Sequence, residues 1–372
     1  MPSSASIVEE LLYPEFAPIL HPFLKEMFEK KSYTAQKMEN YLMNRSEMER
    51  LASRLESYPY NLVSDPSNIC YLKCPLCPTW KDREGRPKGK MSKELFQRLL
   101  DEMGPYLFTL NLCNWGEPLL NPELPEMIAY AKNYNIVVGL STNLNILSDA
   151  MAETIAHSGL DVMIISLDGA SAETYSKYRR GGSFETVIKN IGRLLAFKEE
   201  GRKFPLLIWQ FLVNKYNEGE IEAARVMAEK VGAYFLPSPM RTAMGSELLF
   251  PLYKRVEGMK GWLPENARFN RYAYEITPET RTRQKTCKWL WTTAVVNWDG
   301  SVSPCCGVFE KAWDFGTVSE GCAFHAVWNS ERFVAARKMV GDFLENPTGN
   351  EYPAGHEQLI CSRCIKYGFL ED

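Results

Sequence analysis

Residues 136–168, IVVGLSTNLNILSDAMAETIAHSGLDVMIISLD, contain the pattern that decides the fold of this chain. A β-rich run, IVVGLST, is followed by a helical pattern, SDAMAETIAHSG, and then by a second β-rich run, DVMIISLD. This strand, helix, strand order is typical of a parallel sheet, because parallel neighbours need a long crossover that is usually a helix. We therefore expect the loops after the strands to form the functional site.

The same alternation extends in both directions, from about residue 59 to residue 240. Six β-rich runs can be recognised in it: NLVSDPSNI, LFTLNL, IVVGLST, DVMIISLD, PLLIWQFLVN and AYFLP. Six strands are fewer than the eight that close a full α/β barrel. The pattern predicts an α/β domain with a parallel sheet over residues 59–240.

Three other regions lack this alternation. Residues 1–58 have helical periodicity without β-rich runs, which predicts a helical N-terminal segment. Residues 241–285 are rich in Arg, Glu, Pro and aromatic residues and are interpreted as a linker or lid. In residues 286–372, TTAVVNWDGSVSPC predicts a β-hairpin with its turn at Asp299-Gly300, and NSERFVAARKMVGDFL predicts a helix. We expect this last region to be a small α+β domain.

Composition excludes some classes of partner. The 372 residues carry a net charge of -3, so no basic field for nucleic acid or an anionic membrane is expected. The N-terminus has acidic residues where a signal peptide is basic, and no apolar run approaches the roughly 20 residues of a membrane span. We expect a cytoplasmic protein, in which the ten cysteines bind metal more readily than they form disulfides.

Three cysteines follow the first strand in the sequence CYLKCPLC, at positions 70, 74 and 77. Thiolates are the usual ligands of a [4Fe-4S] cluster, and three of them leave one of its four irons open to another molecule. The alternative is half of a zinc site in a non-catalytic binding module. Zinc needs a fourth ligand, and none of the four histidines adjoins this loop.

This loop resembles that of the radical S-adenosylmethionine (SAM) enzymes, whose hallmark is Cx3Cx2C after the first strand of a partial (β/α)6 TIM-like barrel. The segment NLCNWGEP, residues 111–118, is similar to the Gly-Gly-Glu-Pro segment of that family, although Trp115 replaces its first glycine. Leu76 also departs from the pattern, in which an aromatic residue often precedes the third cysteine. The resemblance implies that Cys70, Cys74 and Cys77 hold a cluster and that Asn114, Gly116, Glu117 and Pro118 bind SAM.

Further SAM contacts are implied by the ends of the third, fourth and fifth strands. They are Thr142, Asn143, Ser166, Asp168, Arg179 and Val213. In the family pattern, the serine contacts the ribose or carboxylate of SAM and the arginine pairs with its carboxylate. Either Leu212 or Val213 is expected to lie against the adenine.

A second set of cysteines lies towards the C-terminus, at Cys287, Cys305, Cys361 and Cys364. Four thiolates saturate a cluster, so a cluster held by them is suited to carrying electrons. A structural zinc site with four cysteines is the alternative. The order of cysteine, hairpin, cysteine, helix and CxxC resembles the twitch or shortened SPASM extension of radical SAM enzymes, with a one-cluster layout similar to that of 2-deoxy-scyllo-inosamine dehydrogenase.

Three cysteines are left over. Cys306 adjoins Cys305, so it is a candidate substitute ligand or a catalytic hydrogen-atom donor. Cys113 and Cys322 are interpreted as small buried hydrophobic residues.

The resemblance implies that a flavodoxin- or ferredoxin-type protein supplies an electron, and that SAM is cleaved to a 5′-deoxyadenosyl radical that abstracts hydrogen from a C-H bond. With an auxiliary cluster as electron acceptor, we expect a two-electron oxidation of a small natural-product, sugar or nucleoside intermediate. A peptide (RiPP) epimerase or crosslinking enzyme is the alternative. The first 58 residues are shorter and more helical than the leader-binding domain of many peptide-modifying relatives. A non-catalytic electron carrier is disfavoured, because the SAM segments would have no use in it.

Overall fold

The computed structural model describes residues 17–30, 33–81, 85–240, 259–270, 287–345 and 358–367. Nine strands in these ranges form one sheet, in the order β6-β5-β4-β3-β2-β1-β7-β8-β9. The first six are β1 (Asn61–Ser64), β2 (Thr109–Leu112), β3 (Val137–Thr142), β4 (Val162–Ser166), β5 (Leu206–Val213) and β6 (Tyr234–Pro239). Each pairs in parallel with the next, so their C-terminal ends meet at one edge.

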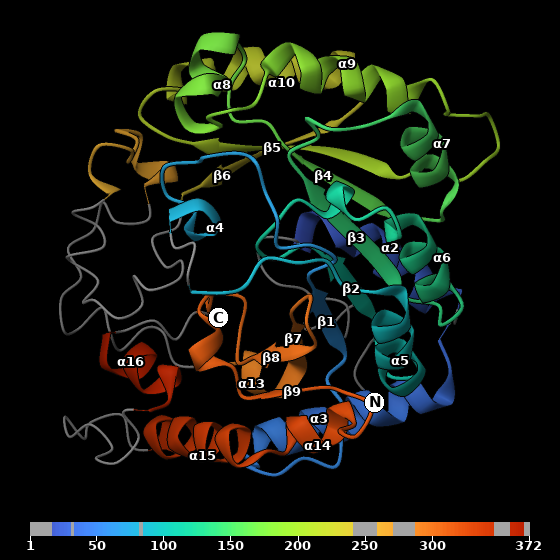
Figure 1. Cartoon of the computed structure of the whole chain (residues 1–372), viewed down its shortest axis with the longest axis vertical. Coiled ribbons are helices and arrows are strands. Elements are labelled where there is room, and N and C mark those ends of the chain that lie inside the picture. Colours follow the sequence, from blue (N-terminus) through green and yellow to red (C-terminus); the bar gives the residue numbers. More distant parts are fainter. Residues whose placement is uncertain are drawn as a thin grey trace.

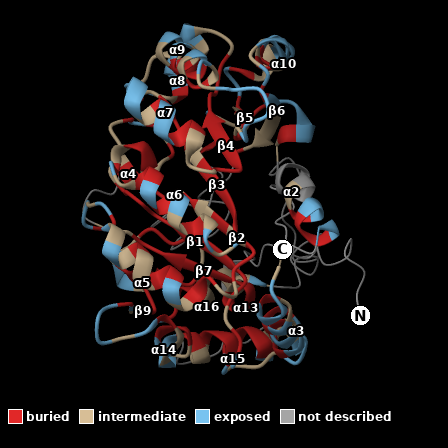
Figure 2. Cartoon of the chain, turned by 90° about the vertical axis from the view of Figure 1, so that its right-hand side faces the viewer, coloured by how far each residue is buried: buried red, intermediate tan, exposed pale blue. Residues whose placement is uncertain are grey.

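Helices cover the outer side of this six-stranded part, as Figure 1 shows. They are α5 (Lys93–Met103), α6 (Leu124–Lys132), α7 (Asp149–His157), α8 (Ala172–Tyr178), α9 (Phe184–Leu195) and α10 (Ile221–Lys230). Short helices lie in the connections: α4 (Pro78–Lys81) and the 3-10 helices η1 (Pro118–Leu120), η2 (Glu218–Glu220) and η4 (Ala267–Phe269). The strands β1, β3 and β4 are almost wholly buried, β6 at the edge of the sheet is not, and the outer helix faces are exposed, as Figure 2 shows.

Serine caps explain where several of these helices begin. The hydroxyls of Ser92, Ser148, Ser171 and Ser183 each accept a hydrogen bond from the backbone N-H three residues further on. Such a cap satisfies an N-H group that has no partner inside the helix. In α9, Val187, Ile191 and Leu194 recur at helical spacing and are fully buried, so this face packs inward.

The C-terminal part continues the sheet instead of forming a separate one. β7 (Thr293–Val296) pairs in parallel with β1, and β8 (Ser301–Ser303) and β9 (Gly316–Thr317) follow in antiparallel order. The remaining elements are α13 (Trp289–Thr292), η5 (Lys311–Trp313), α14 (Phe324–Trp328), α15 (Glu331–Glu345) and α16 (Ile360–Tyr367). One hydrophobic core includes residues of both parts, among them Leu62, Trp291 and Phe333.

Of the N-terminal helices, α2 (Ala17–Glu29) packs against the six-stranded part and α3 (Ala35–Glu49) contacts both parts. The Nζ atom of Lys37 in α3 donates to the carbonyl oxygens of Leu107, Tyr134 and Asn135 at 2.5, 2.6 and 3.1 Å. Asn44 Nδ2 donates to the carbonyl oxygen of Trp291 at 2.8 Å. Thus α3 holds the six-stranded part and the C-terminal part together through polar contacts, and both views (Figures 1 and 2) draw it next to α15.

The predicted fold class is confirmed. All six predicted strands form, the chain turns between β7 and β8 at Asp299-Gly300, and the predicted C-terminal helix is α15. The predicted linker or lid, residues 241–285, lies outside the described residues except for 259–270. The domain boundaries stay predictions. In the part of the chain that the structure describes, no helix has both the length and the apolar character needed to cross a lipid bilayer.

Candidate functional site

Most of the predicted site residues gather at the C-terminal edge of the parallel strands. Asn114 and Glu117 follow β2, Asn143 follows β3, and Ser166 and Val213 end β4 and β5. This is where α/β folds with parallel strands place their functional groups.

The three cysteines of the loop after β1 lie together in an apolar shell. Leu72, Leu76, Tyr178, Met240 and Met259 pack with Cys70, Cys74 and Cys77. Burial raises the pKa of the Cys70 thiol to about 12 and that of Cys74 to about 11. Thiolates at these positions therefore need a cation beside them, as an iron ligand has.

Two polar side chains point at the sulfur atoms of this loop. Asn143 Nδ2 donates to Cys70 Sγ at 3.8 Å, and Arg179 Nη1 donates to Cys74 Sγ at 3.9 Å. Hydrogen bonds to ligating sulfurs are one of the ways in which a protein sets the potential of an iron-sulfur cluster. Both side chains are hydrogen-bond donors, as expected beside sulfur atoms that ligate iron as thiolates.

Glu117 is the polar centre of the site and is only 1% exposed. Its Oε1 accepts from Thr142 Oγ1 at 2.6 Å, and its Oε2 accepts from the backbone N-H of Asn143 at 2.8 Å. Its own backbone N-H donates to the carbonyl oxygen of Ile69 at 2.8 Å. Burial raises the pKa of this carboxyl, and these donors oppose that rise. Glu117 thus joins the ends of β2 and β3 to the start of the cysteine loop.

The residues around Glu117 have little room. A Cβ on Gly116 would lie 1.8 Å from the carbonyl oxygen of Ser67, so only glycine fits against the backbone that leads into the cysteine loop. Pro118 begins the short helix η1, where a missing N-H costs nothing. The segment is therefore shaped by its contact with the loop.

Asp65, which follows β1, fixes the backbone at the start of this segment. Its Oδ1 accepts from the backbone N-H groups of Asn114 and Trp115 at 2.7 and 2.9 Å. Burial raises its pKa to about 6. Two buried atoms nearby, Asp65 Oδ2 and Asn114 Nδ2, have no hydrogen-bond partner among the described residues. Such unpartnered atoms fit a polar ligand at this place.

Asp168 and Arg179 form a buried pair. Arg179 Nε donates to Asp168 Oδ2 at 2.5 Å, and Asp168 Oδ1 accepts from the backbone N-H of Leu212 at 2.8 Å. Asp168 is fully buried, and burial raises its pKa while Arg179 lowers it. Arg179 is thereby held between Asp168 and the sulfur of Cys74.

The adenine contact is the one place where two neighbouring residues were expected as alternatives. Val213 is fully buried in the main core, whereas Leu212 packs beside the cysteine loop. Successive side chains of a strand face opposite ways, so only one of the two faces the loop. Leu212 is the better candidate, and Val213 lies away from the site. Ser166 ends β4 and is 9% exposed.

Of the second set of cysteines, Cys305 and Cys361 pack against one small apolar cluster, and Cys287 and Cys361 pack against the main core. The pKa of Cys305 is raised by burial and then by the charges of Cys306, Cys361 and Cys287, which places these thiols within electrostatic range of one another. Cys287 and Cys361 are likewise buried groups with a raised pKa. Cys364 lies one helical turn after Cys361 in α16.

The spacing of the cysteines bears on the zinc alternative. Within the described ranges, no three His, Cys, Asp or Glu side chains come close enough together to hold a single metal ion. A zinc site requires such a compact set. A four-iron cluster is wider than one ion, so its thiolates stand farther apart than those of a zinc site.

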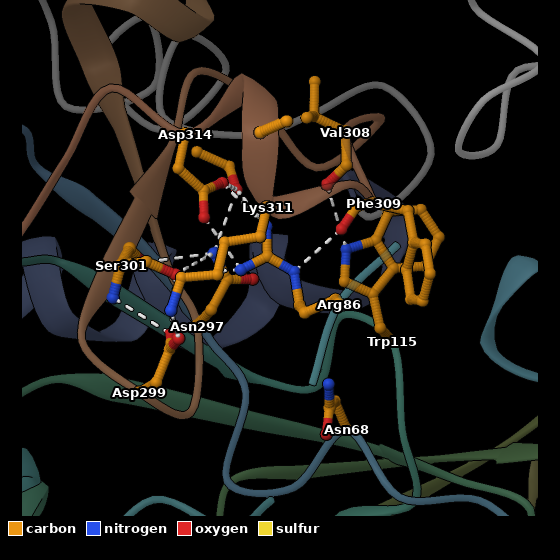
Figure 3. Close-up of polar contacts among 12 residues, drawn as sticks. Asn68, Arg86, Trp115, Asn297, Asp299, Ser301, Val308, Phe309, Lys311 and Asp314 are labelled. Atoms are coloured by element: carbon orange, nitrogen blue, oxygen red, sulfur yellow. Dashed lines mark hydrogen bonds and ion pairs between the residues drawn. The ribbon is translucent and has the colours of Figure 1, made fainter. Parts of the chain in front are cut away.

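A buried arginine joins the two cysteine regions, as Figure 3 shows. Arg86 lies in the connection after the first cysteine loop and is fully buried. Its Nη1 and Nη2 donate to the two carboxylate oxygens of Asp314 at 2.8 and 2.7 Å, and its Nε donates to the carbonyl oxygen of Phe309 at 2.7 Å. The hydroxyls of Ser301 and Ser303 accept the remaining bonds, at 2.8 and 3.4 Å. All five N-H groups of the guanidinium are therefore used.

Trp115, which replaces the first glycine of the family segment, makes a second connection (Figure 3). Its Nε1 donates to the carbonyl oxygen of Val308 at 3.2 Å, and its ring meets Phe309 edge-on at 5.3 Å. Thr79, two residues after Cys77, donates its hydroxyl to the carbonyl oxygen of Trp115. Val308 lies three residues after Cys305, so this one side chain spans the loops that carry the two cysteine sets.

Comparison with known proteins agrees with this geometry. Residues 64–221 match the Radical SAM superfamily, and residues 287–365 match SPASM, an iron-sulfur cluster-binding domain. The chain is a radical SAM enzyme with a C-terminal SPASM domain. Its cofactors are a [4Fe-4S] cluster and SAM, with auxiliary iron-sulfur centres in the SPASM domain.

Individual relatives are distant. The tungsten-containing aldehyde ferredoxin oxidoreductase cofactor-modifying protein of Pyrococcus furiosus is 25% identical over 310 residues, covering 76% of this chain and 84% of that protein. Mycofactocin maturase MftC of Mycobacterium ulcerans is 28% identical over 176 residues, covering 47% of this chain and 46% of that protein. SuiB of Streptococcus suis has a TM-score of 0.54 at 14% identity, covering 90% of this chain and 83% of that one. This last likeness concerns the fold alone.

The sequence pattern missed several residues that the structure brings to the site. Tyr71 donates its hydroxyl to Asn143 Oδ1 at 2.8 Å, and Asp65 and Arg86 have the contacts given above. Cys113, interpreted as a small hydrophobic residue, has a pKa raised by burial and then by Asp65, Glu117 and Cys70, so it adjoins the site. For Asp65, its position directly after a strand was a feature of the sequence that could have indicated a site residue. No feature of the sequence pointed to Arg86, because its partner Asp314 lies 228 residues away.

We predict that Arg86→Met lowers the free energy of unfolding by about 3–5 kcal/mol, because it leaves the Asp314 carboxylate buried without its partner. Urea unfolding of the cluster-loaded protein measures this. Arg86→Met combined with Asp314→Leu should recover much of the loss, since the uncompensated charge is gone. Arg225→Met, which breaks an exposed pair with Glu222, is the matched control and should change little. An Arg86→Met protein as stable as wild type would contradict the role of this pair.

Proposed function

We propose that this enzyme uses SAM to remove a hydrogen atom from a C-H bond and oxidises a small natural-product, sugar or nucleoside intermediate by two electrons. The C-terminal cysteines Cys287, Cys305, Cys361 and Cys364 hold one auxiliary [4Fe-4S] cluster that accepts an electron from the substrate. The observation that carries this proposal is the linkage of the three-cysteine loop to Glu117, Asn143 and Arg179 by hydrogen bonds. We place the reaction in the cytoplasm, where free thiols persist.

Each residue of the site has a distinct part in the proposal. Cys70, Cys74 and Cys77 ligate three irons of the cluster, and Asn143 and Arg179 donate to their sulfurs. Glu117 binds the amino group of SAM, with Asn114, Gly116 and Pro118 shaping its surroundings, and Thr142 fixes the carboxylate. Ser166, Asp168 and Leu212 face the nucleoside half. When bound, SAM supplies a 5′-deoxyadenosyl radical, and the apolar shell of the loop keeps water away from it.

The position of the second cysteine set supports an oxidation. Cys305 and Cys361 pack in one cluster, and Trp115 and Arg86 hold the loop after Cys305 through Val308 and Phe309. A fully ligated cluster there has no open iron and serves to take up an electron. A flavodoxin- or ferredoxin-type protein supplies the electron that starts each turnover. Cys306 is the candidate hydrogen-atom donor if the outcome is epimerisation instead.

Peptide modification is the second candidate. The resemblance to mycofactocin maturase MftC favours it, as does the fold of SuiB, which has also been seen with its precursor peptide SuiA. In this reading the same radical chemistry acts on a peptide side chain or backbone.

We predict that Cys70→Ala, Cys74→Ala or Cys77→Ala abolishes formation of 5′-deoxyadenosine from SAM under dithionite, because each change removes a ligand of the open cluster. Chromatography of the reaction mixture measures the product. Cys322→Ala is the control and should retain wild-type cleavage, since Cys322 packs against the main core and not in the cluster around the cysteine loop. Sustained cleavage by Cys74→Ala would reject the assignment.

We predict that Cys361→Ala lowers bound iron from about eight to about four atoms per chain while 5′-deoxyadenosine still forms, because only the auxiliary cluster loses a ligand. Iron and sulfide analysis with visible spectroscopy measures this. Four irons in the wild-type protein, with no further loss in the variant, would remove the auxiliary cluster from the proposal. One zinc per chain would favour the structural alternative.

Oxidation and epimerisation differ in their isotope pattern. Once a substrate is converted, we expect a product that is lighter by two mass units, because a proton and an electron leave the substrate radical. In deuterated water this product should carry no deuterium at the attacked carbon. Mass spectrometry measures both. Deuterium incorporated at that carbon at unchanged oxidation level would instead identify a thiol donor, with Cys306→Ala as the variant that then loses activity.

A further inference from the structure

A basic hollow opens on the surface beside the first cysteine loop. It has a volume of about 390 Å³ and is lined by Glu173, Ser176, Lys177, Arg180, Tyr216 and Trp262. Its walls come from α8 and from the segments that follow β5 and precede η4. In Figure 1 these lie towards the upper left of the molecule, on the same side as α4.

Positive charge surrounds the hollow. Lys177 and Arg180 line it, and exposed Lys73 and Lys215 belong to the segments that contact it. Glu173 is the one acidic residue of the lining, and its Oε1 is 4.0 Å from Lys177 Nζ with both side chains exposed, which makes a weak pair. The lining, with Lys177, Arg180 and Glu173, carries one net positive charge, whereas the chain as a whole carries a net charge of -3.

The hollow is joined to the cysteine loop by the backbone. The N-H of Lys73 donates to the carbonyl oxygen of Arg180 at 2.8 Å. Lys73 lies directly before Cys74, in the interval between the first two cysteines. Therefore anything that docks on Lys177 and Arg180 comes to rest against the outer side of this loop.

A row of aromatic rings runs from the surface to the same cysteines. Tyr216 is 45% exposed and meets Trp262 edge-on at 5.2 Å, and Trp262 meets Tyr178 at 5.4 Å. Tyr178 is only 6% exposed and packs against Leu72 and Cys74. Three side chains in contact thus connect an exposed aromatic group with a sulfur of the loop.

We propose that this hollow is the docking surface for an acidic flavodoxin, which delivers one electron to the cluster of the first cysteine loop. The inference rests on the proposed function. In the step, the flavin hydroquinone of the carrier is oxidised by one electron to its semiquinone, and the cluster is reduced by one electron. The carrier then dissociates in its semiquinone form.

Charge and shape both favour this occupant. An acidic carrier complements the four basic residues, and such complementarity raises association rates and selects partners. The flat Tyr216 and Trp262 rings suit the exposed edge of a flavin, since aromatic pairs pack edge-on or offset. The lining of the hollow includes neither Glu117 nor the residues at the strand ends that are expected to contact SAM.

The test compares two reductants for one reaction. In Lys177→Glu/Arg180→Glu, titration calorimetry with oxidised flavodoxin at low salt should show binding at least about tenfold weaker than wild type, because like charges now face each other. Cleavage of SAM driven by reduced flavodoxin should fall by a similar factor. Cleavage driven by excess dithionite, which needs no docking surface, should stay within about twofold of wild type.

A matched control reverses two exposed lysines elsewhere. Lys198 follows α9 and Lys230 ends α10, both at the opposite edge of the strands. Lys198→Glu/Lys230→Glu changes the net charge equally and should bind flavodoxin as wild type does. Equal weakening by both pairs would overturn the proposal, because the effect would then reflect net charge alone. Unchanged binding by Lys177→Glu/Arg180→Glu would overturn it as well.

Failure of this inference differs from failure of the proposed function. If the chain does not cleave SAM at all, the wild-type protein gives no 5′-deoxyadenosine with either reductant. If only the docking surface is wrong, the wild type cleaves SAM with both reductants, and Lys177→Glu/Arg180→Glu does so equally well.

Discussion

The carboxylate of Glu117 is the interaction on which the rest of the site depends. It accepts hydrogen bonds from Thr142 and from the backbone of Asn143, while its own backbone donates to Ile69. These bonds tie the ends of two neighbouring strands to the residue before the first cysteine. Because a buried carboxylate is costly without donors, the arrangement is stable only as a unit. The cysteine loop is consequently held in one position relative to the SAM segment.

A second constraint is the joint between the two halves of the molecule. The pairing of β1 with β7 makes the sheet continuous, and the Arg86 and Asp314 pair closes the loop that follows the hairpin. A bidentate arginine fixes angle as well as distance. With Trp115 reaching Val308, the loops of the two cysteine sets are positioned by the same buried contacts. Electron exchange between two centres requires such fixed spacing.

Much of the fold followed from local patterns. Alternating β-rich and helical runs predicted six strands, and Asp299-Gly300 predicted the hairpin, because strand and turn preferences act over a few residues. The cysteine spacing predicted the loop. The sequence left two residues for the adenine contact, since Leu212 and Val213 are both apolar and only the packing of β5 shows that Leu212 faces the loop. The nearness of Cys113 to Asp65 and Glu117 could not be predicted, because it depends on three segments meeting.

The sequence by itself determined the parallel α/β architecture, the family of the enzyme and the cysteines available as ligands. Each of these depends on residue types that lie only a few positions apart in the chain. Only the tertiary structure decided that β7 joins β1, that Arg86 finds Asp314 and that Trp115 bridges the two cysteine regions. Their partners lie about 200 residues apart in the chain. Such contacts form only when the whole sheet has been assembled, since no local preference of either residue specifies the other.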